Sequence, residues 1–298
     1  MLDLGDDQIV VGVARCVESK MKRLRGAACE HDLSGTAANG LGNRFPGRVD
    51  RFLGFVAELV GGCQLSNIRQ GVAQAIHYAR HRRAFGKHLV EQPLMQNVLA
   101  DMALESEAAT ALAFRVARSF DDGKSAALFS RLATPIGKYW LNKRVVNFVY
   151  EAMECHGGAG YVEESILPRL FRQSPLNSIW EGSGNVICLD VLRALTREPE
   201  TADALFAELD KARGAYASLD KAIDAAKHGL ATATEPNARR LVETLALTLQ
   251  ASLLAQHAPT AIADGFIATR LGDAPWRTYG AFEAEIDPDV VFTVFGPQ

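Results

Sequence analysis

One carboxylate in the sequence has neighbours that suit proton transfer. Glu181 lies between the aromatic ring of Trp180 and the small residues Gly182–Ser183–Gly184. An apolar wall raises the pKa of a carboxylate toward the range in which it can act as a base. Glycines let the backbone approach a ligand closely. The residues therefore indicate a catalytic base, and the alternative is an ordinary acid in the first turn of a helix.

The residues after this turn have the spacing of a helix with one apolar face. That face comprises Val186, Leu189, Val191, Leu192 and Leu195. We expect Ser183 or Asn185 to cap this helix, so that its positive end points at the turn.

A second group of chemically able residues follows a long apolar stripe. Apolar residues recur at helical spacing from about 52 to 79, with a weak point at Gly61–Gly62, and the stripe ends at Arg80–Arg83 before Phe85–Gly86. Basic side chains and a glycine are typical of a helix C-terminus. The functional alternative is that Arg82 holds a phosphate. His77 and His81 have metal-ligand spacing but no third ligand, so we interpret them as a surface pair and predict no metal site.

Two long helices and a glycine-rich loop separate these groups. We expect one helix to start at Gln92–Pro93 and end near Asp121, and another to cover about 125–155, with a kink or break at Pro135. Three glycines in residues 157–160 then end the helix and leave backbone amides free, which suits a phosphate or a simple corner.

Composition places the chain among ordinary globular proteins. It has 298 residues, 48 % of them hydrophobic, and a formal net charge of −3, which gives no general attraction to nucleic acid. No apolar run is long enough to span a membrane, and the acidic N-terminus lacks the parts of a signal peptide. Five scattered cysteines without a CxxC pair indicate reduced thiols and no zinc site. We expect a cytoplasmic protein.

The remaining sequence predicts more helix and an irregular tail. Helical segments are expected at 202–229, 238–256 and 260–271. The predicted fold class is all-α, an antiparallel helix bundle with a short irregular N-terminal segment. The expected divisions are an irregular segment over 1–50, a bundle over 51–197, an additional helical region over 198–272 and an irregular tail over 273–298.

Three pieces taken together resemble the acyl-CoA dehydrogenase family. They are Arg82-Arg-Ala-Phe-Gly86, Glu154-Cys-His-Gly-Gly-Ala-Gly-Tyr161 and Trp180-Glu-Gly-Ser-Gly-Asn185, in the order and spacing of the family's C-terminal helical domain. The similarity looks closest to the AidB-like, alkylation-response branch. The runs Val90-Glu-Gln-Pro-Leu-Met95 and Leu176-Asn-Ser-Ile-Trp180 point to that branch.

The resemblance implies an FAD-dependent oxidoreductase. It implies that Glu181 removes the α-proton of an acyl-CoA while the β-hydride goes to the flavin. It also implies a homo-oligomer, a dimer or tetramer, in which FAD is shared between subunits and Arg82 and Phe85 meet the FAD of a neighbour. The cofactor contacts implied in this way are Arg82, Phe85, Gly86, Glu154, Gly157, Gly158, Trp180, Ser183 and Asn185.

The sequence departs from the family pattern in its first part. Family members carry a helical domain and a β-domain ahead of the helix that ends at Arg82, whereas only about eighty residues precede it here. We expect the helical domain to be absent, residues 27–38 to be a β-domain remnant, and activity to be impaired by truncation. Ala57 falls where the family has a substrate-facing arginine, and Arg51 is the nearest basic residue. Glu154 replaces the glutamine of most members, as in the AidB-like branch.

Two alternatives to catalysis remain open. One is a non-catalytic, oligomerising helical module. The other is a DNA-associated alkylation-protection protein, because the AidB-like branch is associated with DNA through its last helical region. From Arg193 onward, the sequence contains ten Lys and Arg residues and fifteen Asp and Glu residues. This acidic balance opposes binding to phosphates.

Overall fold

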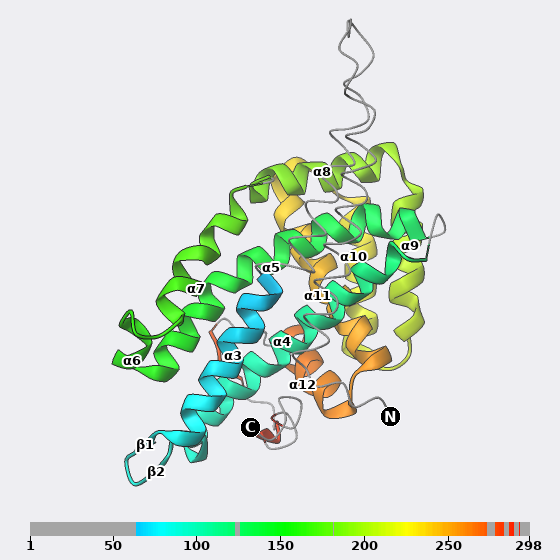
Figure 1. Cartoon of the computed structure of the whole chain (residues 1–298). Helices are drawn as coiled ribbons and strands as arrows, with labels where there is room; N and C mark the ends of the chain where they lie inside the picture. Colours follow the sequence, from blue (N-terminus) through cyan, green and yellow to red (C-terminus); the bar gives the residue numbers. More distant parts are fainter. Residues whose placement is uncertain are drawn as a thin grey trace, which may run out of the picture.

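The computed structural model describes residues 64–122, 126–180, 182–272, 278–282, 286–288 and 292. The expected N-terminal segment 1–50, the start of the first helix and Glu181 lie outside the described residues. The expected all-α fold is confirmed, since helices make up nearly all of the described chain. The helices form a bundle. A β-hairpin with two residues in each strand lies at one end of this bundle (Figure 1).

The elements follow one another along the chain in this order: α3 Gln64–His81, β1 Arg83–Ala84, β2 Lys87–His88, η1 Leu89–Glu91, α4 Pro93–Ser119, α5 Ala127–His156, α6 Gly158–Tyr161, α7 Leu167–Gln173, η3 Ser174–Ser178, α8 Gly184–Arg197, α9 Glu200–Leu209, η4 Asp210–Ala212, α10 Ala217–Ala231, η5 Glu235–Asn237, α11 Ala238–His257 and α12 Thr260–Leu271.

α5 is the central helix of the bundle. It packs against α3, α4, α6, α7, α8, α9, α11 and η3. Its residues are apolar on several sides, as a helix surrounded by others requires, and Leu132, Ile136, Val145 and Phe148 are fully buried in it. Of the kink or break predicted at Pro135, the break is absent, because α5 continues as one helix past this residue.

The C-terminal helices pack around α11. This helix contacts α4, α5, α8, α9, α10 and α12. The single segment expected over 202–229 is two helices, because the chain leaves α9 through η4 and turns at Gly214, where φ is 87°. A glycine adopts this left-handed conformation without strain. Within the described part of the chain, no helix is both long and apolar enough to cross a membrane.

Buried charges tie α12 and the segment after it to the bundle. Arg144 of α5 makes a two-pronged hydrogen bond to Glu105 of α4, with Nε–Oε1 at 2.6 Å. Arg270 of α12 pairs with Asp101 and reaches Glu105. Burial alone would raise the pKa of Glu105, but the Arg144 charge and hydrogen bonds outweigh it, and the pKa is lowered. The Gly280 amide donates to Asp101 Oδ2 at 2.9 Å, so residues beyond α12 also contact the core.

Candidate active site

A buried lysine binds the backbone of Trp180, the first residue of the Trp180–Asn185 segment. The η3 turn ends with the Leu176 carbonyl accepting from the amides of Ile179 and Trp180, at 2.9 and 3.2 Å. The Trp180 carbonyl then accepts from the ammonium of Lys138, in the middle of α5, at 3.0 Å. Lys138 has no exposed surface. The Trp180 residue itself is 44 % exposed, so the backbone is anchored while the residue remains open to contact.

α8 begins directly after the turn. Ser183 takes the cap position with extended backbone angles, but its side chain makes no cap hydrogen bond. The Asn185 side chain accepts instead from Arg239 of α11, with Nε–Oδ1 at 2.8 Å. The predicted start of the helix is therefore confirmed in position, while the predicted side-chain cap is wrong. The Ser183 side chain therefore does not occupy the first amides of α8, and the helix dipole favours an anion there.

Gly184 lets a second lysine come close to this helix end. A Cβ on Gly184 would lie 3.0 Å from Lys143 Cε and 3.3 Å from a ring carbon of Tyr139. Burial raises the pKa of the Cys188 thiol. The positive charges of Arg239 and Lys143 lower this pKa, but burial outweighs them. Two cations thus lie beside the start of α8, and they favour a negatively charged group there.

The Arg82–Gly86 piece forms the hairpin at the end of α3. Arg83 pairs with His88 and Ala84 with Lys87, which leaves Phe85 and Gly86 as a two-residue turn. Both have positive φ, 53° and 83°, as a type I′ turn requires. Phe85 is 96 % exposed, and among the described residues the exposed Arg82 guanidinium has no carboxylate partner. The hairpin therefore presents an aromatic ring and a cation outward.

The glycine loop ends α5. The Gly157 amide donates to the Glu154 carbonyl at 2.9 Å, and Gly157 has φ 58°. Gly157, Gly158 and Glu154 are exposed. Glu151, one turn earlier, was not singled out by sequence reasoning, and burial followed by the Glu154 charge raises its pKa to about 7. Burial also raises the pKa of Cys155 to about 12, so this thiol stays protonated and unreactive.

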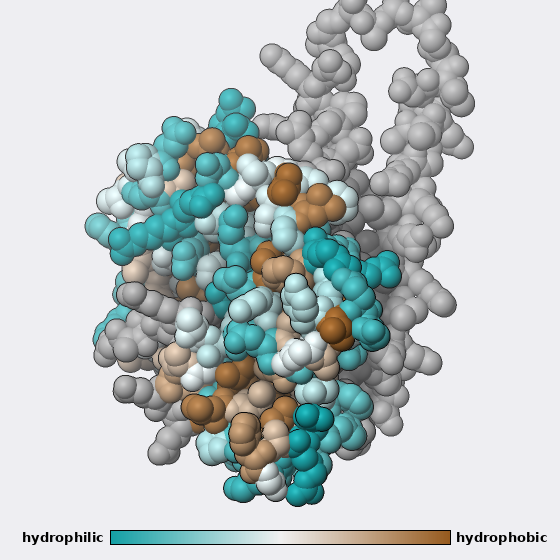
Figure 2. Space-filling model, turned by 90° about the vertical axis from the view of Figure 1, so that its left-hand side faces the viewer, coloured by the Kyte–Doolittle hydropathy of each residue, from teal (hydrophilic) through white to brown (hydrophobic). Residues whose placement is uncertain are grey.

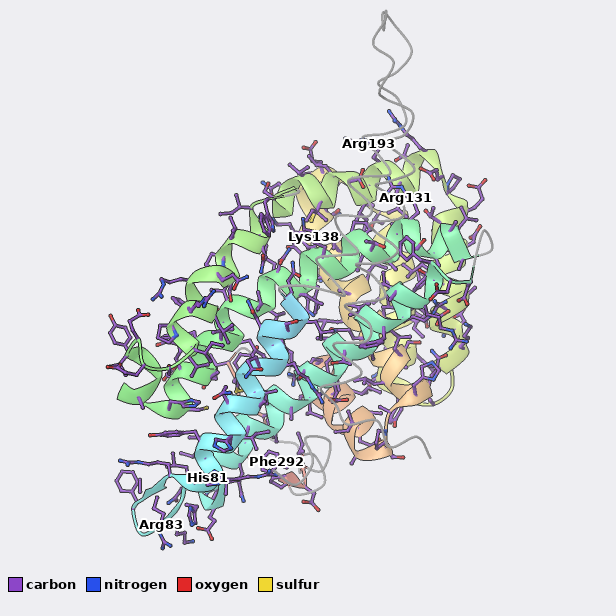
Figure 3. All side chains as sticks on the ribbon, in the orientation of Figure 1. His81, Arg83, Arg131, Lys138, Arg193 and Phe292 are labelled. Carbon is purple, nitrogen blue, oxygen red and sulfur yellow. The ribbon has the colours of Figure 1, made fainter. Side chains whose placement is uncertain are left out.

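The structure brings together only part of the expected site. Trp180 contacts Lys138, and Ser183 and Asn185 stand at the start of α8, whereas the β1–β2 hairpin that carries Phe85 lies at the opposite end of the bundle from α8 (Figures 1 and 3). The face with α6 and α7 has apolar patches between hydrophilic side chains (Figure 2). Exposed apolar residues in this part of the chain include Tyr161, Val162 and Ile166.

The histidines of α3 form a surface pair, as expected. The centroids of the His77 and His81 rings are 4.4 Å apart with the ring planes tilted by 37°, and His81 Nδ1 lies 2.8 Å from the His77 carbonyl oxygen. Among the described residues, no group of three or more His, Cys, Asp or Glu side chains could hold a metal ion.

Sequence reasoning missed the basic residues around the turn. Lys138 and Lys143 lie in a helix otherwise interpreted by its apolar stripe, and Arg239 comes from a helix more than fifty residues later. The available signal in the sequence was that Lys138 interrupts the apolar face of α5, where a lysine is unusual. The partner of each residue depends on tertiary packing that one sequence does not reveal.

The family is established by comparison with known proteins. Residues 51–196 match the family described as acyl-CoA dehydrogenase, C-terminal domain. Through these residues the chain belongs to the acyl-CoA dehydrogenase family.

Individual relatives point the same way. The chain is 45 % identical over 183 residues to the putative acyl-CoA dehydrogenase AidB of Escherichia coli, a match that covers 60 % of this chain and 34 % of that protein. Its fold is similar to that of Caenorhabditis elegans ACDH-11 in complex with C11-CoA, with a TM-score of 0.65, 24 % identity and coverage of 83 % of this chain and 48 % of that one.

A third similarity is to an acyl-CoA dehydrogenase from Bacillus anthracis complexed with FAD, with a TM-score of 0.52, 21 % identity and coverage of 75 % of this chain and 44 % of that one. The chain spans about a third of the length of the curated relative and less than half of the two solved structures.

Proposed function

We propose that this chain supplies the C-terminal part of an FAD-dependent oxidoreductase of acyl-CoA dehydrogenase type, in which Glu181 is the base. The single observation that carries the proposal is the construction of the turn around this residue. The Trp180 carbonyl, which precedes Glu181, accepts from Lys138 at 3.0 Å, and α8, which follows, starts without a cap hydrogen bond from the Ser183 side chain, beside Lys143 and Arg239.

The turn suits proton abstraction next to a thioester. A carboxylate base must stay in one place relative to the α-carbon of its substrate, because proton transfer needs hydrogen-bond reach. The described residues on either side of the proposed base are anchored: the Trp180 carbonyl before it accepts from Lys138, and α8 follows it. Trp180, the residue directly before Glu181 in the sequence, is 44 % exposed and offers an apolar surface. Such a surface favours a base with a raised pKa.

The residues also fit the cofactor that the family uses. Arg82, which has no carboxylate partner among the described residues, and the exposed Phe85 suit a diphosphate and an aromatic ring, and the exposed backbone at Gly157 and Gly158 suits a close approach. Ser183 and Asn185 would contact it at the start of α8. Bound FAD would supply a hydride acceptor. The relative from Bacillus anthracis was crystallised with this cofactor.

A site shared between subunits would account for the separation of these residues. The β1–β2 hairpin, whose turn holds Phe85, and helix α8 lie at opposite ends of one protomer (Figure 1). A strained, exposed aromatic at a hairpin tip is typical of a residue that acts on another molecule. We therefore propose that one subunit presents Arg82 and Phe85 while its neighbour presents the Glu181 turn, in a homo-oligomer that acts on acyl-CoA.

Spectroscopy of the purified protein tests the proposal. We expect bound flavin absorbance that is bleached anaerobically by one or more of a series of short, medium and long saturated acyl-CoA thioesters. Glu181→Gln should keep the flavin and lose the bleaching, since it removes the base alone. Phe85→Ala should lower the flavin content instead.

The opposite results would reject the proposal. A colourless protein that cannot be reconstituted with FAD, but that self-associates, would favour a non-catalytic helical module. A Glu181→Gln variant that is bleached as fast as the wild type would remove Glu181 as the base.

DNA association has weaker support in the described residues. Several basic side chains of the last helical region are neutralised by carboxylates: Arg213 by Asp210 and Asp224, Lys227 by Asp210, and Lys211 by Glu208. We expect no retardation of duplex DNA even at low salt, where phosphate contacts are strongest.

A further inference from the structure

A buried polar face of α5 lies against the segment that leads to the Glu181 turn. Lys138 and Asn142 are one helical turn apart and are 0 % and 2 % exposed. Ser178 Oγ donates to the Asn142 carbonyl at 3.2 Å, and Gln64 Nε2 of α3 donates to Asn142 Oδ1 at 2.8 Å. One strip of α5 thus holds the end of η3 and the residues directly after it.

Lys138 occupies the end of this strip nearest the turn. The helical run through α7 and η3 finishes just before Trp180, where carbonyls no longer find partners within their own helix. The Lys138 ammonium donates a hydrogen bond to the Trp180 carbonyl oxygen at 3.0 Å. A hydrogen bond from a charged donor is stronger than one between neutral groups, and a cation at a helix C-terminus also stabilises the dipole.

The burial of Lys138 needs an explanation beyond stability. A lysine with no exposed surface gives up the hydration of its charge, and an apolar residue of similar size at such a position is often as stable or more stable. A buried cation that contacts a loop carbonyl restricts the geometry of that loop. The carbonyl carbon of Trp180 is covalently bonded to the Glu181 nitrogen, so the restricted carbonyl is the one directly before the proposed base in the chain.

We propose that Lys138 is a positioning residue that fixes the backbone entering Glu181 by donating to the Trp180 carbonyl. This proposal rests on the proposed role of Glu181 as base. Lys138 touches the backbone of the turn and acts on the reaction through Glu181.

Cleavage at the turn tests the positioning directly and without flavin. Lys138→Met removes the charge and the donor but keeps an unbranched apolar chain. We expect a glutamate-specific protease to cleave the native Lys138→Met protein after Glu181 at least about tenfold faster than the wild type, because a charge-assisted hydrogen bond corresponds to about a tenfold or larger change in an opening equilibrium. Cleavage at other glutamates should not change. Lys221→Met, on the exposed surface of α10, is the matched control and should be cleaved at the wild-type rate.

Kinetics of the flavin-loaded protein separate positioning from folding. Lys138→Met should lower kcat at least about tenfold with little change in KM, because the substrate still binds while the base is displaced. Lys138→Arg keeps a cation and should recover part of both losses. Lys138→Gln keeps a neutral donor and should lie between Lys138→Met and the wild type. It also serves as the test variant if Lys138→Met does not fold.

The outcomes distinguish the two proposals. If folded Lys138→Met or Lys138→Gln is cleaved at the wild-type rate, Lys138 does not position the turn. If cleavage is faster but the wild type takes up no flavin, the positioning stands and the oxidoreductase proposal falls. If flavin reduction proceeds in the wild type and is unchanged in the variant, the positioning role is rejected and the proposed function remains.

Discussion

The pair between Arg115 of α4 and Glu208 of α9 makes the stability of the bundle depend on pH. Arg115 contacts both carboxylate oxygens of Glu208, at 2.8 and 2.9 Å, and Lys211 adds a contact at 2.7 Å. The Glu208 side chain is only 5 % exposed. Burial would raise its pKa, but the hydrogen bonds from Arg115 and Lys211 and their charges lower it to about 2, from an ordinary value of 4.5.

The size and sign of the effect follow from these values. A folded-state pKa below the unfolded one stabilises the fold above the unfolded pKa, and the stabilisation is lost as the pH falls through the folded pKa. Each pKa unit corresponds to about 1.4 kcal/mol, so Glu208 contributes about 3 kcal/mol at neutral pH. This contribution should disappear between about pH 4.5 and pH 2.

Urea unfolding followed by helical circular dichroism at a series of pH values measures this contribution. The difference in unfolding free energy between the wild type and Glu208→Gln should be largest above pH 4.5 and shrink toward pH 2. Glu163→Gln is the matched control, because Glu163 makes a similar two-pronged pair with Arg172 on the exposed surface and should show little difference at any pH. A wild-type-to-Glu208→Gln difference that stays constant from neutral pH to pH 2 would refute the reasoning.

Three further substitutions test other parts of the structure. Arg144→Met should lower the unfolding free energy by about 3–5 kcal/mol, because it leaves Glu105 buried without its main partner; adding Glu105→Gln should recover part of the loss in the same urea titration. Gly157→Ala should lower the unfolding free energy by about 1–2 kcal/mol, because φ of Gly157 is 58°. Gly158→Ala is its control and should change the urea midpoint little, because an added Cβ there meets nothing within 4 Å. Phe85→Gly should raise the unfolding free energy by about 1 kcal/mol by relieving a positive φ in a non-glycine residue; an unchanged or lower midpoint would show that the turn is not strained.

The helices with long apolar stripes were predicted well from the sequence. α4 starts at Pro93, as the proline at its first position indicated, and α5 ends at His156 before Gly157. These positions depend on local chemistry, since proline lacks an N–H and glycine accepts a positive φ. The junction between α9 and α10 was missed, because Gly214 lies in a stretch whose composition is otherwise helical.

The surroundings of the candidate site could not be predicted in the same way. The three motifs pointed to Arg82, Gly157 and Glu181 through resemblance, but the residues that hold the turn were not found. Lys138 was hidden because a lysine is normally exposed, and its burial depends on η3 packing across α5 from about forty residues later. Asn185 has a side-chain oxygen that could cap its own helix, yet Arg239 competes for it across the bundle.

The uninterrupted course of α5 sets a fixed spacing within the protomer. Lys138 marks the Trp180 turn, and Gly157 marks the end of the same helix. At 1.5 Å per residue these two points are about 28 Å apart along the helix axis. A molecule that touches both in one protomer must be at least that long, and a shorter one can touch both kinds of residue only where two protomers meet. The length of one helix therefore limits which ligands a single protomer can hold at both points.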